Sequence, residues 1–161
     1  IESFLDKLSL PVLTDQKEEL DKPIFEEEIV DVITLLTTGK LPGPDGFTVE
    51  FYKMYCKELT PYLLNMYEES FANGSLPPTL SEALISLILK KGKDPHNCQS
   101  YRPISLINCD AKILDKVLAK RLDKVVETLV HPDQVGFIHQ RNSTDNIRRF
   151  IDIMWHVQSD Q

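Results

Sequence analysis

Cysteine, glycine and long apolar runs are scarce in this sequence of 161 residues, which has three cysteines and six glycines. Cys56, Cys98 and Cys109 are odd in number and widely spaced, so they favour neither a disulfide framework nor paired metal ligands, and a reducing compartment is expected. The apolar runs are only a few residues long, whereas a membrane helix needs about 20. The first 30 residues contain no short apolar core flanked by basic residues. We therefore expect an intracellular protein, cytoplasmic or nuclear, that is neither secreted nor inserted in a membrane.

Self-contained catalytic motifs are also missing. The patterns G-x-S-x-G, G-x-G-x-x-G and the P-loop do not occur. The four histidines form no pair at metal-ligand spacing, and the cysteines lack CxxC spacing. The aspartates are scattered, which is typical of helix caps and surface charges. We accordingly predict no catalytic residue and no metal site within this chain.

What the sequence does have is an uneven distribution of charge. The formal net charge is −7, but residues 1–36 hold ten acids and three bases, whereas residues 37–161 hold fifteen of each. Residues 84–124 alone contain nine bases and four acids. An acidic leader thus masks a basic centre, and the net charge does not argue against a nucleic-acid ligand.

Apolar periodicity and helix-boundary residues predict a mainly helical chain. Helices are expected over residues 25–36, 48–56, 61–71, 110–130 and 145–157. Pro61 is expected at a first helical position, Gly74 just past a helix end, and Asp110 as the N-cap of the longest helix.

Between these helices lies a segment that predicts an antiparallel β-hairpin. Residues 84–89 are almost wholly apolar and read as a buried strand, and residues 102–107 read as a second strand. Lys90, Lys91 and Lys93 fall at the tip, and Arg102 lies in the second strand. Converging cations of this kind suit a polyphosphate, since lysine supplies point charge and arginine a planar fork. A solvated basic turn explains the same pattern, just as a solvated helix face explains the lysines spaced by four from Lys112 to Lys124.

Two loops could also contact nucleic acid. Residues 42–46, with the sequence PGPDG, could present backbone N–H groups to a phosphate or a template strand, or could be an ordinary connector. In the segment 134–138, Gln134 and Phe137 could offer an amide and an aromatic ring to a base. The alternative for Phe137, a place in the core, is common for a phenylalanine close to β-branched residues such as Val135 and Ile138.

Five blocks in fixed order resemble the reverse transcriptase of non-LTR retrotransposons, and among these the chain is most similar to vertebrate long interspersed elements. The blocks are LPGPDGFTVEFY (41–52), LILKKGKD (87–94), SYRPISLIN (100–108), KIL with LAKRL (112–114 and 118–122), and HPDQVGFI (131–138). The resemblance implies an RNA-dependent DNA polymerase of right-hand shape. The expected fold class is α+β, mainly helical with a short antiparallel β-hairpin, in which residues 1–24 form an acidic leader. Residues 25–161 would form a partial reverse transcriptase domain comprising the N-terminal extension, the fingers and the start of the palm.

The resemblance also implies roles for individual residues. Those expected to contact the incoming nucleotide are Lys90, Lys91, Arg102, Gln134, Gly136 and Phe137. Those expected to lie against template RNA are Pro42, Gly43, Pro44, Asp45, Gly46, Phe47 and Lys93. The partners implied for the intact enzyme are an RNA template, a DNA primer and a deoxynucleoside triphosphate.

Departures from the family pattern limit what the chain is expected to do. The family holds Mg²⁺ with aspartates, two of them in a Tyr-x-Asp-Asp turn, and that turn is absent here. We therefore expect Mg²⁺ in the intact enzyme but none held by this chain, which would be inactive alone and, since it begins at Ile1, a piece of something longer. The alternatives are a residual RNA-binding module and a non-functional relic. Arg141 follows His139 and Gln140 where the family often has Pro-Gly or Lys-Gly, which leaves its role open.

Overall fold

The computed structural model describes residues 15–159, so positions 1–14 of the predicted leader lie outside the described residues. The chain divides into two compact units, Pro23–Leu118 and a second unit formed by residues up to Lys22 together with residues from Ala119 onward. The elements are α2 (Asp15–Leu20), α3 (Glu26–Leu35), α4 (Val49–Met54), α5 (Cys56–Asn73), α6 (Pro78–Ser81), β1 (Ala83–Leu89), η1 (Cys98–Ser100), β2 (Tyr101–Ile107), α7 (Cys109–Leu129) and α8 (Ser143–Ser159). The mainly helical α+β class with one antiparallel hairpin is confirmed. None of the helices described here is long and apolar enough to cross a membrane.

The core of the unit Pro23–Leu118 lies between α3, α5 and the beginning of α7. The fully buried side chains include Ile29, Ile33, Tyr67, Ile113 and Val117. The apolar face predicted for the helix at residues 25–36 is confirmed for its two isoleucines. Helix α3 is also stabilised at its start, where the Glu28 carboxylate accepts a hydrogen bond from the Phe25 N–H at 3.0 Å.

Two helix starts differ from the sequence prediction. Helix α5 begins at Cys56, so Pro61 lies inside it rather than at its first position. Because proline has no N–H, the helix loses one intrahelical hydrogen bond near its start, the one to the Lys57 carbonyl oxygen. Helix α7 begins at Cys109, so Asp110 lies in the first turn instead of capping it. The predicted end of α5 is confirmed, because Gly74 follows it with a left-handed φ of 64°.

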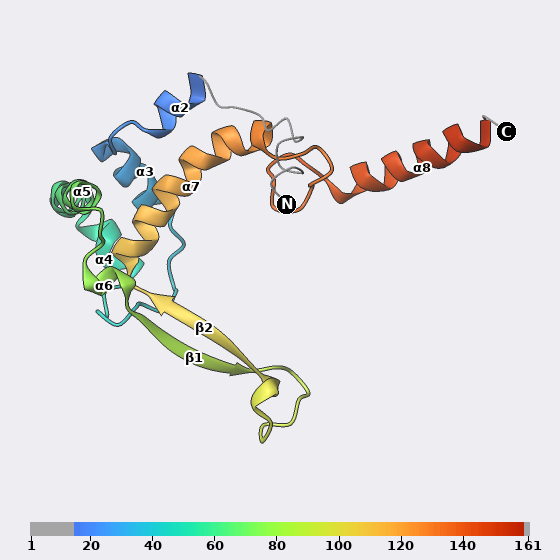
Figure 1. Cartoon of the computed structure of the whole chain (residues 1–161). Coiled ribbons are helices and arrows are strands. Elements are labelled where there is room, and N and C mark those ends of the chain that lie inside the picture. Colours follow the sequence, from blue (N-terminus) through green and yellow to red (C-terminus); the bar gives the residue numbers. More distant parts are fainter. Residues whose placement is uncertain (1–14, 160–161) are drawn as a thin grey trace. The chain divides into compact units, whose positions relative to one another are not determined.

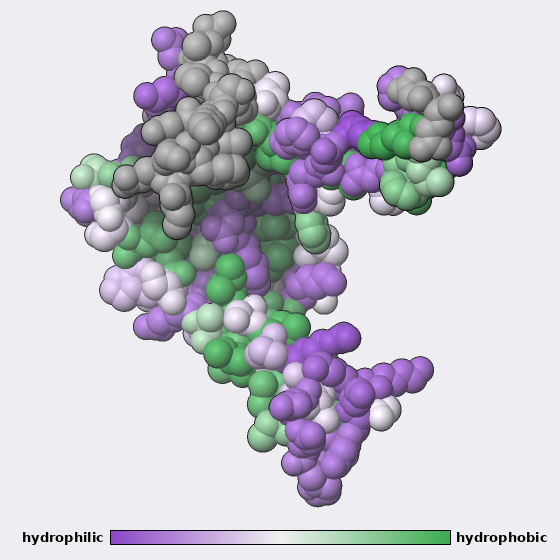
Figure 2. Space-filling view, turned by 45° about the vertical axis from the view of Figure 1, so that its right-hand side comes forward, coloured by the Kyte–Doolittle hydropathy of each residue, from purple (hydrophilic) through white to green (hydrophobic). Residues whose placement is uncertain are grey.

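The hairpin forms where it was predicted, within one residue at its ends. Strands β1 and β2 pair antiparallel, with Ala83 opposite Ile107 at the base and Leu89 opposite Tyr101 near the tip. The prediction that residues 84–89 are buried is wrong, because Ile85 and Leu87 are each 63% exposed. Each strand has one neighbour in the sheet, and most side chains of the ribbon are exposed. Figure 2 shows the result as a hydrophobic band that ends in a hydrophilic tip.

The second unit contains α2, the last turns of α7, the loop 131–142 and α8. Arg121 on α7 is 8% exposed. Its Nη1 donates to the carbonyl oxygens of Leu20, the last residue of α2, and of Lys22, which follows that helix. Helix α8, predicted over residues 145–157, spans Ser143–Ser159 and none of its side chains is buried. Its exposed apolar side chains include Ile147, Phe150, Ile151, Met154 and Trp155.

Candidate nucleic-acid and nucleotide interface

The register of the hairpin decides which side chains can act together. Arg102 lies directly opposite Ile88, and side chains alternate between the two faces of a strand. Lys90, two residues after Ile88, therefore falls on the same face as Arg102. The Lys90 N–H donates to the Ser100 carbonyl oxygen at 2.8 Å, which extends the ladder one step beyond the strand. The fold thus brings together two of the cations assigned to the nucleotide, one from each strand.

The turn at the tip displays the other two lysines. The Lys93 N–H bonds the Lys90 carbonyl oxygen at 3.1 Å, and Gly92 supplies the left-handed φ of 74° that this turn requires. Lys91 and Lys93 are exposed, whereas the Lys90 ammonium donates to the Gln99 carbonyl oxygen at 2.8 Å and is partly covered. The Lys90 side chain is therefore held against the hairpin, whereas Lys91 and Lys93 present their charges to solvent.

The opposite face of the hairpin holds a shallow apolar cavity that the sequence reasoning missed. Its volume is about 400 Å³, and it is lined by Leu87, Pro95, His96, Cys98, Tyr101 and Pro103. The Tyr101 hydroxyl donates to the Pro95 carbonyl oxygen at 3.0 Å, which ties the loop to the strand. The cations and the cavity thus lie on different faces, so the basic face alone is suited to phosphate.

The segment 42–47 forms a turn whose shape is fixed by its own hydrogen bonds. The Gly46 N–H bonds the Gly43 carbonyl oxygen at 3.1 Å, and the Asp45 carboxylate accepts the Phe47 N–H at 3.0 Å. Gly46 adopts a φ of 78°, which glycine reaches without strain. The Phe47 ring stacks on Phe51 of α4 with centroids 4.6 Å apart and remains 47% exposed. Part of the Phe47 side chain is therefore accessible from solvent.

Asn108, between β2 and α7, attaches this turn to the base of the hairpin. Its Oδ1 accepts the Asp45 N–H at 3.2 Å, and its Nδ2 donates to the Thr79 carbonyl oxygen in α6 at 3.0 Å. The side chain is 3% exposed. Sequence reasoning gave Asn108 no role, and the only available signal was an amide residue placed between a strand and a helix.

The block 134–137 belongs to the other unit, where it lies in the loop between α7 and α8. Gln134 folds back, with its Nε2 donating to the Gly136 carbonyl oxygen at 3.2 Å. Phe137 is fully exposed and adopts a φ of 63°, so the alternative that it belongs to the core is wrong. An exposed ring at the end of a turn can stack on a base, whereas Gln134 already uses one amide hydrogen internally.

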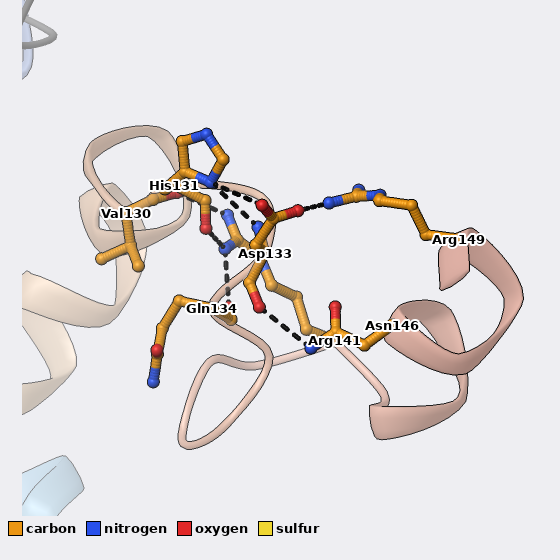
Figure 3. A network of polar contacts seen from close by, with 7 residues as sticks. All are labelled: Val130, His131, Asp133, Gln134, Arg141, Asn146 and Arg149. Carbon is orange, nitrogen blue, oxygen red and sulfur yellow. Dashed lines mark hydrogen bonds and ion pairs between the residues drawn. The ribbon is translucent and has the colours of Figure 1, made fainter. Parts of the chain in front are cut away.

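Arg141 holds that turn to the end of α7 (Figure 3). Its Nη1 donates to the carbonyl oxygens of His131 and Gln134 at 2.7 and 2.9 Å. Its Nη2 donates to those of Glu127 and Val130 at 2.8 and 3.0 Å. A cation at a helix C-terminus satisfies orphan carbonyl groups and the negative end of the helix dipole. Arg141, whose role the sequence left open, therefore fixes the loop instead of facing a ligand.

Asp133 adds a second tie between the same loop and α8. Figure 3 shows its carboxylate between the His131 ring and the Arg149 guanidinium, and the His131 Nδ1 lies 3.4 Å from the nearer oxygen. The Asn146 Nδ2 donates to the Asp133 carbonyl oxygen at 3.1 Å. Arg149 of α8 is thereby paired with the carboxylate of this loop, so it does not add to the cations available to a ligand.

Two ionisable groups near the turn 42–47 have pKa values that partial burial raises. Burial raises the pKa of Asp110, although the Ala111 N–H that bonds its carboxylate opposes the shift. Burial likewise raises the pKa of the Tyr67 hydroxyl, which donates to the Asp110 carbonyl oxygen at 2.8 Å. Among residues 15–159, no group of three or more His, Cys, Asp or Glu side chains comes together as metal ligands.

Comparison with known proteins places these features in a family. Residues 88–161 match the family described as reverse transcriptase (RNA-dependent DNA polymerase). The chain is 35% identical over 146 residues to the transposon TX1 uncharacterized 149 kDa protein of Xenopus laevis. This alignment covers 90% of this chain and 11% of that protein. It is 32% identical over 147 residues to the probable RNA-directed DNA polymerase from transposon BS of Drosophila melanogaster, covering 90% of this chain and 16% of that protein. A third relative, the RNA-directed DNA polymerase from mobile element jockey of Drosophila funebris, is 27% identical over 131 residues, covering 80% of the chain and 14% of the relative. The chain, although it spans only a small part of each relative's length, belongs to the reverse transcriptases of non-LTR retrotransposons.

Proposed function

We propose that this chain supplies the template and nucleotide contacts of a retrotransposon RNA-directed DNA polymerase. The observation that carries the proposal is the register of the hairpin, which sets Lys90 and Arg102 on one face beside the tip. An arginine fork and a lysine at that spacing can share the oxygens of one triphosphate, while Lys91 and Lys93 extend the positive potential toward RNA. In residues 84–109 the only acid is Asp94, so little opposes that potential.

The other two blocks receive complementary roles. The turn 42–47 would lie against the template backbone, with its exposed Phe47 ring and main-chain N–H groups toward the RNA. The block with Gln134, Gly136 and Phe137 would lie beside the base of the incoming nucleotide, Phe137 stacking on it. The reverse transcriptase portion would comprise residues 25–161, preceded by the acidic leader 1–24, and its partners in the intact enzyme would be RNA template, DNA primer and deoxynucleoside triphosphate.

Salt-titrated binding of a fluorescein-labelled single-stranded RNA tests the contact role. The assay contains no triphosphate, so Lys90 and Arg102 are available to RNA phosphate together with Lys91 and Lys93. With these four cations on phosphate, the plot of log K against log salt should have a slope of about −3, because each cation contributes about −0.7 on a single strand. The double variant Lys90→Ala with Arg102→Ala should reduce this slope to about −1.5 for the same reason. A matched control, Lys17→Ala with Lys57→Ala, removes two exposed positive charges elsewhere and should leave the slope unchanged. Equal slopes for the two double variants would overturn the proposal.

We further propose that the chain alone does not polymerise. Two-metal phosphoryl transfer requires carboxylates that clamp the attacking and leaving oxygens, and the sequence has no Tyr-x-Asp-Asp turn to supply them. A primer-extension assay on an RNA template with Mg²⁺ should give no incorporation above a blank without protein. Incorporation that persists after repurification would contradict this part of the proposal and leave the contact role intact.

A further inference from the structure

Asn108 is a buried amide that joins three separate pieces of chain. It accepts from Asp45 in the turn 42–47, donates to Thr79 in α6, and itself stands between β2 and α7. Helix α6 leads into β1 and Asn108 follows β2, so both ends of the hairpin are tied to the turn through one side chain. We propose that Asn108 is a positioning residue that seats the turn 42–47 against the base of the hairpin before RNA binds, an inference that rests on the template role proposed above for this turn.

Gly43 provides independent support for this placement of the turn 42–47 against the base of the hairpin, which we call the seat. A Cβ added at Gly43 would overlap the side chain and backbone nitrogen of Asn108 and would lie 2.5 Å from the carbonyl carbon of Ile107. Two of these obstacles are backbone atoms, which cannot move aside as the end of a flexible side chain can. Gly43 also has no left-handed φ, unlike Gly46, so its lack of a side chain serves close approach and not an unusual conformation.

The hydrogen bonds within the turn and the hydrogen bond to Asn108 have different roles. The Gly46 to Gly43 bond and the Phe47 to Asp45 bond are local and fix the shape of the turn. The bond from Asp45 to Asn108 spans 63 residues and fixes its place. A turn that is already seated loses less conformational freedom when it meets a ligand, which strengthens binding without adding a contact.

Two variants disturb the seat in different ways. Asn108→Asp keeps the oxygen that accepts from Asp45 but replaces the donor to Thr79 by a second acceptor, which faces a carbonyl oxygen. Gly43→Ala keeps Asn108 and displaces the turn by overlap. The matched control is Gly39→Ala, whose φ of 72° brings backbone strain while its Cβ would meet nothing within 4 Å.

The experiment uses the full chain and measures three quantities for each variant. These are the exchange rate of the Asp45 amide hydrogen, the thermal midpoint, and the affinity for the labelled single-stranded RNA. We expect faster exchange at Asp45 and RNA binding weaker by about tenfold in both seat variants, as for a ligand that meets a binding-competent form populated about one tenth of the time. In Gly39→Ala the thermal midpoint should fall while the exchange at Asp45 and the affinity stay near wild type.

The outcomes separate this inference from the proposed function. Fast exchange at Asp45 with unchanged RNA affinity would overturn the positioning role and leave the hairpin contacts standing. Unchanged exchange at Asp45 in both seat variants would overturn the seat itself. An affinity loss in Gly39→Ala equal to that of the seat variants would assign the effect to stability and also overturn the inference. If the wild-type chain does not bind RNA while Asp45 exchange still responds, the seat stands and the proposed function fails.

Discussion

The exposure of the hairpin leads to a prediction that compares one substitution at two sites. Ile85 of β1 is 63% exposed, whereas Ile113 of α7 is fully buried. Both are isoleucines, so Ile85→Thr and Ile113→Thr remove the same atoms and add the same hydroxyl. Because their burial differs, the two variants should differ widely in their free energy of unfolding.

The magnitudes follow from burial. Only about a third of the Ile85 side chain is covered, and fully burying an isoleucine is worth about 1.5–3 kcal/mol, so Ile85→Thr should cost about 0.5–1 kcal/mol. Threonine keeps the β-branched shape that strands favour, so the backbone adds little. Ile113→Thr should cost about 2–4 kcal/mol, because it removes fully buried apolar surface and places a hydroxyl in the core.

Urea unfolding followed by far-ultraviolet circular dichroism measures both values, provided that the transitions share one slope. A cost for Ile85→Thr as large as that for Ile113→Thr would refute the reasoning, because it would mean that β1 is packed on both faces, as its sequence alone predicted. A chain with no cooperative transition would contradict the core described between α3, α5 and α7 and would support the relic alternative.

Three further predictions concern single groups. Arg141→Met should weaken the end of α7 by about 1–2 kcal/mol and speed amide exchange there, since four carbonyl groups lose their donor, while Arg141→Lys should restore part of the protection; equal exchange in both variants would contradict a capping role. Gly74→Ala should cost about 1 kcal/mol in urea unfolding, because its φ of 64° disfavours a side chain although the added Cβ would meet nothing; a neutral result would argue against the left-handed end of α5. Burial raises the pKa of Asp110 in the folded chain, so ionisation of its carboxylate lowers the free energy of unfolding. This loss of stability is absent below the usual aspartate pKa and grows as pH rises through the folded value, so Asp110→Asn should stabilise the chain more at neutral pH than at acid pH. A difference in stability between wild type and variant that does not change with pH would contradict this.

The elements that sequence predicts well are those set by local rules. The hairpin ends within one residue of prediction because a short apolar run, a basic turn with Gly92 and a second extended run leave few alternatives. Burial of β1 was predicted wrongly because an unbroken apolar run is typical of a strand covered on both faces, whereas burial depends on what else packs there. The position of Pro61 was also predicted wrongly, because a proline favours the first position of a helix, whereas this helix begins five residues earlier, at Cys56.

The same distinction between local sequence rules and tertiary packing applies to the residues of the candidate interface. Its cations could be found from composition, because charge clusters in sequence are also clusters on a hairpin tip. Asn108 and Arg141 could not, because the partners of Asn108 lie 63 and 29 residues away, and those of Arg141 are backbone carbonyl groups that every sequence has. Periodicity and spacing carry no information about such partners.

Asn108 and Arg141 nevertheless have similar roles, one at each end of α7. Asn108 stands immediately before α7 and holds the turn 42–47, and Arg141 binds carbonyl groups at the end of α7 and holds the turn with Phe137. In each case an exposed loop that is assigned a ligand contact is fastened to a rigid helix by a residue that makes no such contact itself. Loops placed this way can present main-chain groups and aromatic rings without a large ordering cost on binding. Substitutions at either end of α7 should therefore change ligand affinity more than their distance from the ligand would suggest.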